Sequence, residues 1–346
     1  MIVWIFLIIY LLLLRLLMGS LNTKYKQKLY LILSGIVIVL IMGFRYPKYN
    51  IVYDLEIYYN YYKNLSYLSW KEIFDYSRFE YGYAILNKLL VSIVPWPQFI
   101  IIFEAFICVY SMFRFIYKYS NNAFWGVLFY VTLGTMSFQL TAFRQAFAIS
   151  ICLYSIDYIK QHKILKFLVL VLIAATFHKT AIVFLPLYFI GQRKLNLKNN
   201  LISIICIVIL ISSANWITNF GNEILGMNYK SIYIGNEFGG IVPILIYIIT
   251  IVLSWINLKN ESDVISLNMT EMGLGIYAMR YSSIALERIS FYYTPSIVIS
   301  LPNVLNSFND RKIQFIIKLC ALILAILLFY HRLTYSEWAD YKFFWQ

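Results

Sequence analysis

The chain has 346 residues, of which 61% are hydrophobic and only 13% are charged, and its formal net charge is +13. A soluble domain of this size carries about 25% charged residues, so the composition excludes an ordinary soluble protein and indicates one that crosses a membrane several times. The basic residues are scattered over many short loops instead of forming one basic domain, which argues against nucleic-acid binding.

Apolar runs long enough to cross a bilayer as helices follow one another along the chain. By this criterion we expect about eleven spans, at residues 2–18, 29–44, 99–117, 123–138, 142–159, 165–177, 201–220, 241–257, 267–285, 289–305 and 313–330. The first run lacks the basic start and the cleavage site of a signal peptide, so we expect it to remain as a span. The predicted fold class is all-α, a single polytopic membrane domain over residues 1–346.

The four cysteines each lie inside an apolar run, at Cys108, Cys152, Cys206 and Cys320. They lack the close spacing of a zinc site or a redox pair. A buried free cysteine behaves as a small hydrophobic residue, so we expect all four to be packing residues.

Short basic clusters recur between the apolar runs and predict the orientation, because loops rich in Lys and Arg stay in the cytoplasm. If the spans alternate, these clusters share one side: Lys24, Lys26 and Lys28; Arg114 and Lys118; Lys160, Lys163 and Lys166; Arg193, Lys194 and Lys198; and Arg311, Lys312 and Lys318. That side is predicted to be cytoplasmic.

Residues 180–190 are too few to cross the membrane alone. The clusters at Lys160 and Arg193 flank this stretch, and one crossing between them would place one cluster outside. A half-helix that returns after an outward hairpin, with His178 at its tip, keeps both inside. Irregular backbone at that depth needs protein or water beside it, so His178 is expected to line a cavity that opens outward.

Residues 45–98 form the longest hydrophilic stretch and fall on the outer side of this arrangement. Asp54 and Tyr58 are spaced i, i+4, and Glu80, Tyr83 and Asn87 are spaced i, i+3, i+7, so each set is predicted to share one helical face. Two readings stay open and are compatible: an amphipathic helical segment lying on the membrane surface, and a lid over a site.

Two apolar segments in the middle of the chain carry strong polar groups. Arg144 and Gln145 open the first, and His178 and Lys179 interrupt the second. A cation near hydrocarbon depth costs about 2.5 to 3.5 kcal/mol, so it normally faces water, a partner or a substrate. The alternative for either residue alone is a helix end whose long side chain reaches the interface.

These motifs carry a family resemblance. The order FRQAFAISICLYSIDYIKQHK and then FLVLVLIAATFHKTAIVFLPL resembles the central signature of the EpsG family of polysaccharide polymerases, relatives of the Wzy-type O-antigen polymerases. Three further blocks are also similar: GFRYPKYNIVYDLEIYYNYY, FEYGYAILNKLL and RISFYY. The positions that match the family are Arg144, Gln145, Phe177, His178 and Ala181, then Arg45, Asp54 and Tyr58, then Glu80 and Gly82, and finally Arg288.

The resemblance implies a membrane glycosyltransferase that polymerises oligosaccharide repeat units carried on undecaprenyl pyrophosphate. Transfer would be inverting, without a nucleotide donor or cofactor, at the outer face of the bacterial cytoplasmic (inner) membrane. The expected partners are the lipid-linked donor and acceptor and membrane lipids, with a chain-length regulator and a flippase as candidates.

Site roles follow from the chemistry that such a transfer needs. Arg45, Arg144 and Arg288 are expected at the outer ends of three helices, where their rigid guanidinium forks could bind pyrophosphate; interfacial anchoring is the alternative for each. The candidate general bases are His178, Asp54 and Glu80. Further substrate-binding residues are assigned as Gln145, Tyr58, Tyr292 and Lys179. No metal ion is expected.

Three rival functions remain open on the sequence. An O-antigen ligase-like enzyme would use the same donor with a different acceptor. A membrane O-acyltransferase also uses an intramembrane histidine but has no need of outward arginines. A polysaccharide or lipid transporter would show inverted repeats and broken helices, of which the sequence offers one broken segment.

Overall fold

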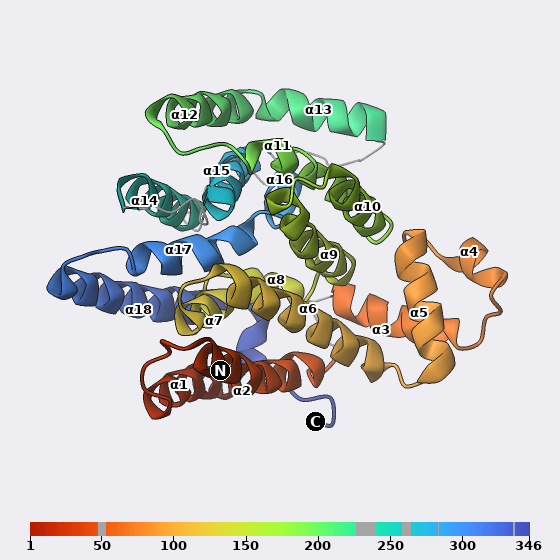
Figure 1. The fold of residues 1–346 in the computed structure, drawn as a ribbon. Coiled ribbons are helices and arrows are strands. Elements are labelled where there is room, and N and C mark those ends of the chain that lie inside the picture. Colours follow the sequence, from red (N-terminus) through yellow and green to blue (C-terminus); the bar gives the residue numbers. More distant parts are fainter. Residues whose placement is uncertain (48–52, 226–239, 258–263, 283, 335) are drawn as a thin grey trace.

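The computed structural model describes residues 1–47, 53–225, 240–257, 264–282, 284–334 and 336–346, which are almost entirely helical (Figure 1). The helices are α1 Ile2–Leu17, α2 Lys24–Gly43, α3 Tyr53–Leu65, α4 Glu72–Tyr76, α5 Tyr81–Ile93, α6 Gln98–Tyr119, α7 Ala123–Thr132, α8 Thr135–Gln139, α9 Phe143–Lys160, α10 Ile164–Ala175, α11 Leu187–Ile190, α12 Leu197–Ser212, α13 Ala214–Leu225, α14 Ile241–Asn257, α15 Val264–Ala278, α16 Ile284–Ser290, α17 Ile297–Leu305 and α18 Arg311–Thr334. Short 3₁₀ helices are η1 Lys179–Phe184, η4 Met279–Tyr281, η5 Thr294–Ser296 and η6 Glu337–Asp340. The all-α prediction is confirmed.

Three of the described helices are long and apolar enough to cross a membrane: α2, α6 and α18. A fourth span is possible if α12 and the start of α13, which bend by 55°, are taken as one. Six shorter apolar helices accompany them: Ile2–Leu17, Ala123–Thr132, Ile164–Ala175, Lys179–Ile190, Ile241–Asn257 and Thr294–Leu305. The count of about eleven spans stays a prediction.

Several predicted spans are interrupted where the local sequence demands it. The span expected at residues 123–138 breaks at Gly134, whose φ of 101° lies in the left-handed region that glycine tolerates. The span expected at 289–305 divides into α16, η5 and α17, with Pro295 at the start of η5. Proline at a first helical turn loses no internal hydrogen bond, so it starts a new helix where the old one ended.

Side-chain caps define several helix starts. The Thr23 hydroxyl accepts from the amide of Lys26 and begins α2, and the Asn122 amide oxygen accepts from the amides of Phe124 and Trp125 and begins α7. Such caps satisfy backbone donors that have no partner inside the helix.

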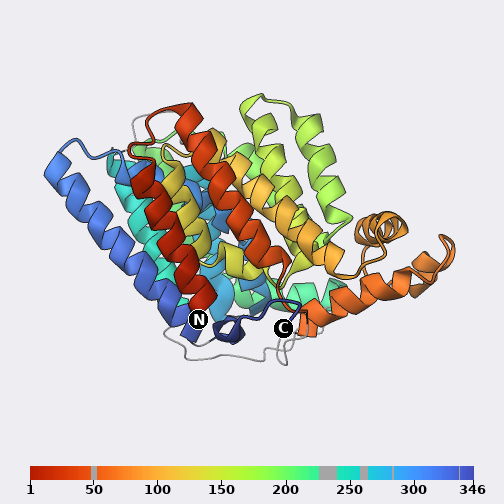
Figure 2. The same cartoon turned by 90° about the horizontal axis from the view of Figure 1, so that it is seen from below.

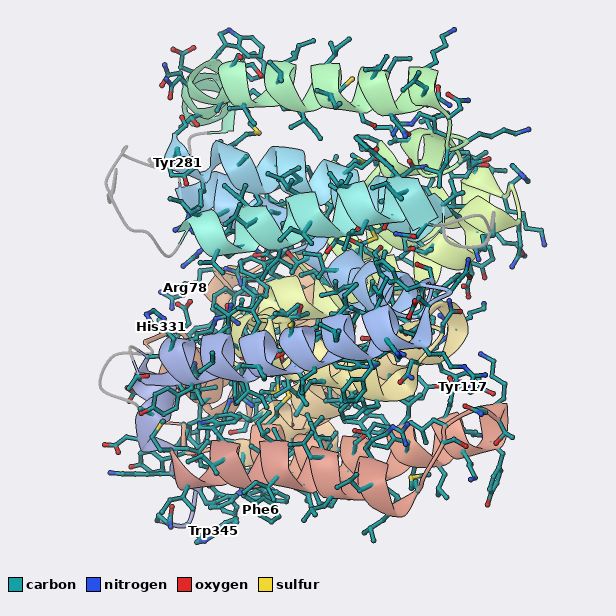
Figure 3. The ribbon with its side chains drawn as sticks, turned by 90° about the vertical axis from the view of Figure 1, so that its left-hand side faces the viewer. Phe6, Arg78, Tyr117, Tyr281, His331 and Trp345 are labelled. Carbon is teal, nitrogen blue, oxygen red and sulfur yellow. The ribbon has the colours of Figure 1, made fainter. Side chains whose placement is uncertain are left out.

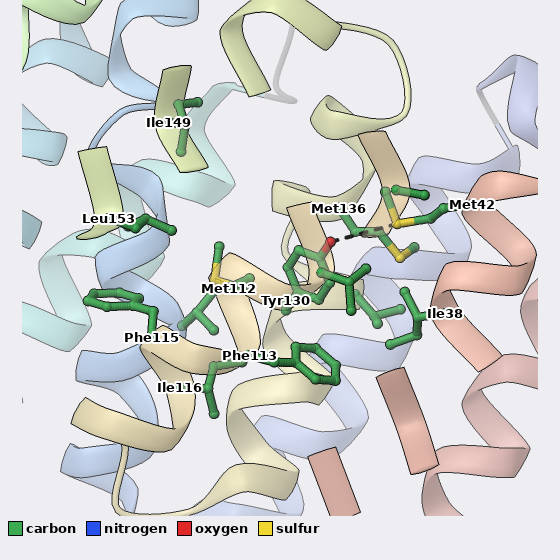
Figure 4. Close-up of a cluster of buried hydrophobic side chains, with 14 of the residues drawn as sticks. Ile38, Met42, Met112, Phe113, Phe115, Ile116, Tyr130, Met136, Ile149 and Leu153 are labelled. Atoms are coloured by element: carbon green, nitrogen blue, oxygen red, sulfur yellow. Dashed lines mark hydrogen bonds between the residues drawn. The ribbon is translucent and has the colours of Figure 1, made fainter. Parts of the chain in front are cut away.

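The centre of the bundle is formed by α6, which packs against α2 on one side and α9 on another. Lipid chains are as apolar as leucine, so close packing and interhelical hydrogen bonds hold such helices together. The bond from Ser111 on α6 to Ser150 on α9, 2.9 Å long, is one example. Figure 4 shows another part of this core, in which the Tyr130 hydroxyl contacts the Met42 sulfur at 3.7 Å.

Helices α12 and α13 lie at one side of the bundle (Figure 1), and α18 presents a long apolar face that no described residue covers. Cys206 on α12 and Cys320 on α18 are exposed on these faces, whereas Cys108 and Cys152 are buried. The expectation that all four cysteines pack inside the protein is therefore wrong for two of them. An apolar run alone does not distinguish a face that meets protein from one that meets lipid.

The two ends of the bundle differ in the residues they carry. Figure 3 places Arg78, Tyr281 and His331 at one end of the helices and Tyr117 at the other. We call these the Arg78 end and the Tyr117 end. Helices α3, α4 and α5 extend away from one edge of the bundle (Figure 2).

Some of the basic residues that were assigned to the loop clusters form ion pairs with acidic residues of neighbouring helices. Near the Tyr117 end, Arg114 and Lys118 of α6 form ion pairs with Asp157 of α9, the Lys118 contact at 2.7 Å. Arg193, which follows α11, pairs with Glu271 of α15. These pairs join neighbouring helices across the bundle.

Candidate functional site

Arg144 and Glu80 form an ion pair between the first turn of α9 and the residue that precedes α5. The two side chains are 24% and 13% exposed, so the pair is largely sheltered but still reachable from solvent. The Arg144 Nε also donates to the Tyr58 hydroxyl at 3.5 Å, and its guanidinium lies 4.7 Å from the Phe79 ring centre. These contacts fix the orientation of the guanidinium fork.

Gly82 explains how Glu80 reaches this position. Its amide donates to the Thr176 carbonyl at 2.9 Å, which docks the start of α5 on the end of α10. A Cβ at Gly82 would lie 2.2 Å from the Thr176 hydroxyl, so only glycine allows this approach. Glu80 then also accepts from the Lys179 amide at 3.4 Å.

His178 lies in the break between α10 and η1. The segment that follows is short and irregular, with η1 packed against α9 and α10 before Pro186 starts α11. The chain is thus interrupted at His178 and continues as two short helices, while its return from an outward tip stays a prediction. The imidazole Nδ1 is 2.6 Å from the Thr180 hydroxyl, which donates to the Tyr292 hydroxyl at 3.2 Å.

Helix α16 reaches the same cluster from the C-terminal half of the chain. The Gln145 side chain donates to the Arg288 carbonyl at 2.7 Å, and this bond ties α16 to the start of α9. The Arg288 side chain is exposed. Its positive charge nevertheless lowers the pKa of His178.

The charges give His178 and Glu80 different protonation states, and both residues lie outside the spanning helices. Burial and the positive charges of Arg144 and Arg288 together lower the pKa of His178 to about 4, against the opposing charge of Glu80. Burial alone would raise the pKa of Glu80, but the charge and hydrogen bonds of Arg144 outweigh it, and the pKa is lowered. At neutral pH the imidazole is neutral and the carboxylate is ionised.

Two candidate residues do not join this cluster. Arg45 is 0% exposed; it donates to the carbonyls of Met42 and Leu140 and lies 3.5 Å from the Glu104 carboxylate, which is also 0% exposed. Asp54 is exposed at the start of α3, while Tyr58 is buried, so burial separates the two residues expected on one helical face. In α5, Tyr83 and Asn87 are both buried, as their shared face requires.

Two residues of the cluster were not predicted from the sequence. Thr180 contacts His178, and Phe79 contacts Arg144. Thr180 lies two positions after His178, and residues at this spacing point in different directions in a regular helix. The interruption of the helix at His178 brings the Thr180 hydroxyl beside the imidazole ring. In the described part of the chain, no three His, Cys, Asp or Glu side chains come together as a metal site would require.

The residues of this cluster all fall inside one family match. The model of the EpsG family covers residues 28–344, nearly the whole chain. The chain belongs to the EpsG family. EpsG proteins are Wzy-like polymerases, so the family confirms the resemblance drawn from the motifs and indicates a polysaccharide polymerase. Searches of curated proteins and of solved structures found no match.

Proposed function

We propose that this EpsG-family protein joins oligosaccharide repeat units carried on undecaprenyl pyrophosphate, by inverting glycosyl transfer at the outer face of the bacterial cytoplasmic membrane. The observation that carries the proposal is the joining of Arg144, Glu80 and His178 in one partly exposed cluster, with Arg288 beside it. The Arg78 end of the bundle would then face outward.

The arginines are proposed to bind the leaving group. In the transfer, the bond from the sugar's anomeric carbon to the pyrophosphate breaks and the acceptor oxygen forms a new bond to that carbon. The departing pyrophosphate gains negative charge, which Arg144 and Arg288 would stabilise. Glu80 holds Arg144 in place before the donor arrives, and its ion pair with Arg144 makes it a weak base.

His178 is proposed to take the proton of the acceptor hydroxyl. Because Thr180 donates to Tyr292, the Thr180 oxygen accepts from Nδ1–H of the imidazole. The neutral ring then offers Nε2 as a proton acceptor. Asp54 is exposed at the start of α3 and is therefore not preferred as the base.

Arg45 has a supporting role in the proposal. Its guanidinium is committed to Glu104 and two carbonyls in the core, and it has no exposed surface to offer a phosphate. We propose that it holds the end of α2 against α6 and that the pyrophosphate site uses two arginines.

Purified protein in liposomes, supplied with lipid-linked repeat units, tests the function. Lengthening of the lipid-linked chain without any other acceptor supports a polymerase. Growth only when a lipid A core is added would instead indicate a ligase, and movement of the lipid without chain growth would indicate a transporter.

The proposed orientation has its own test. A cysteine placed at Lys179, in protein whose native cysteines are replaced by serine, should react with an impermeant thiol reagent added outside intact cells. A cysteine at Asn309, in the turn between α17 and α18, should be protected. Reversal of this pattern would overturn the orientation.

A further inference from the structure

A cavity of about 590 Å³ is lined by residues of α8, α14, α15, α16, α17 and α18 and by the segments that join them. Its volume is within the range of about 300–1,000 Å³ that small-molecule sites occupy. The proposed mechanism does not use it. The residues that matter for its chemistry are Glu287, Arg332, Phe138, Phe291, Tyr247 and Tyr277.

The cavity combines aromatic walls with two opposite charges. Glu287 lines the cavity, and its Oε2 lies 3.5 Å from the Nε of Arg280. The side chains of Glu287 and Arg280 are 22% and 21% exposed. Tyr277 and Tyr247 offer hydroxyl groups, and Phe291 offers an apolar ring. A sugar presents apolar C–H faces and a rim of hydroxyls, which such rings and polar groups match.

Arg332 is held in the cavity wall by a specific backbone arrangement. Its Nη1 donates to the Thr132 carbonyl at 3.1 Å, and its guanidinium packs on Gly134. A Cβ at Gly134 would lie 2.5 Å from that Nη1, so the glycine that breaks the span after α7 also makes room for the arginine. A cation fixed in this way is pre-organised for hydrogen bonding.

The cavity and the Arg144 cluster share two segments of the chain. Glu287 lines the cavity, and the next residue, Arg288, accepts the hydrogen bond from Gln145 at 2.7 Å. Phe291 stacks on Phe138 with ring centres 3.9 Å apart, and both rings line the cavity. A molecule bound by its pyrophosphate at Arg144 could therefore extend a neighbouring part into this space.

We propose that this cavity is a saccharide subsite that holds a sugar residue of the lipid-linked oligosaccharide while the Arg144 cluster holds the pyrophosphate. The inference rests on the proposed function. A polyprenyl chain would gain nothing from a buried carboxylate and guanidinium, which are costly to desolvate.

Filling the cavity tests the proposal without removing a charge. Ser137 lines the cavity and is partly exposed, so Ser137→Trp should occupy the space with an indole. Asn309→Trp adds the same ring at an exposed position between α17 and α18 and serves as the matched control. Gel filtration and thermal melting of each variant in detergent would show whether it is folded.

The probe is the lipid-free repeat unit released from the natural lipid by mild acid, with binding measured by calorimetry. Ser137→Trp should weaken this binding at least tenfold and raise the KM for the lipid-linked unit by a similar factor. Undecaprenyl pyrophosphate without sugar should bind within twofold of the normal affinity. Asn309→Trp should change none of these. Glu287→Gln, which keeps the side-chain volume, should weaken sugar binding about tenfold.

Unchanged sugar binding in folded Ser137→Trp and Glu287→Gln would overturn the subsite, even if wild-type protein forms polymer. An equal loss of undecaprenyl pyrophosphate binding would also overturn it, in favour of a lipid site. If the wild type binds the sugar, Ser137→Trp does not, and neither lengthens the lipid-linked chain, the proposed polymerisation fails while the subsite stands.

Discussion

Arg144 and Glu80, 64 positions apart in the chain, are joined by an ion pair that links the start of α9 to the residue that precedes α5. The pair places a guanidinium at a partly exposed position near His178. A substrate phosphate that binds Arg144 must therefore share the guanidinium with the Glu80 carboxylate or displace that carboxylate.

Arg144→Lys should leave the protein folded and in the membrane but abolish most chain growth. A single ammonium retains the charge yet cannot reproduce the two-pronged hydrogen bonding of a guanidinium to phosphate. Polymer formation by equal amounts of membrane protein is the measurement. Lys63→Arg, at an exposed position on α3, is the control and should be neutral. Near-normal polymer from Arg144→Lys would make Arg144 a structural anchor.

Chelators should leave chain growth unchanged, because the arginines are proposed to neutralise the leaving group. The measurement is the rate with and without EDTA in metal-depleted buffer. A loss of rate that Mg²⁺ or Mn²⁺ restores would contradict this prediction and would assign the outer carboxylates as metal ligands.

His178→Ala should lower turnover by about 10²- to 10⁴-fold, the usual contribution of a general base, while donor affinity changes little. The donor is held by the arginines, so binding and chemistry should separate. The two quantities are measured side by side on the same preparation. A parallel fall in binding and turnover would show that His178 positions the substrate, and Glu80 or Asp54 would become the candidate base.

The pH dependence of turnover should reflect the lowered pKa of His178. A base is active when deprotonated, so with a pKa of about 4 the rate should hold from neutral pH down to about pH 5 and fall near pH 4. The pKa of this histidine is lower in the folded protein than in the unfolded chain, so the unfolded chain is protonated at a higher pH. The free energy of unfolding should therefore decrease as the pH falls from 6.5 towards 4. A rate that already halves near pH 6.5 would show that burial does not perturb His178 in the working enzyme.

Arg45→Ala should destabilise the protein by about 3–5 kcal/mol, because it leaves the buried Glu104 carboxylate without its partner. Replacing both residues, as Arg45→Met with Glu104→Leu, should recover much of the lost stability and some chain growth. Thermal unfolding in detergent measures the first effect. A double variant that is stable but wholly inactive would place Arg45 in the pyrophosphate site after all.

How far the sequence anticipated the fold depended on the kind of signal. The span expected at residues 241–257 matches α14, because an uninterrupted apolar run has few alternatives to a helix. The run at 123–138 breaks at Gly134, and Arg332, near the other end of the chain, packs against that glycine. Local composition carries no record of a distant partner, and the exposed positions of Cys206 and Cys320 were missed for the same reason.

The sequence by itself determined the all-helical membrane class, the family, and the residues that carry unusual polar groups in apolar surroundings, because hydropathy and short motifs are local properties. Only the tertiary structure decided which of those groups meet. Arg144, Glu80 and His178 come together through the close approach of Gly82 to Thr176, whereas Arg45 turns into the core to pair with Glu104. Each buried charge requires a partner in space, and the packing of helices far apart in the chain decides which residue supplies it.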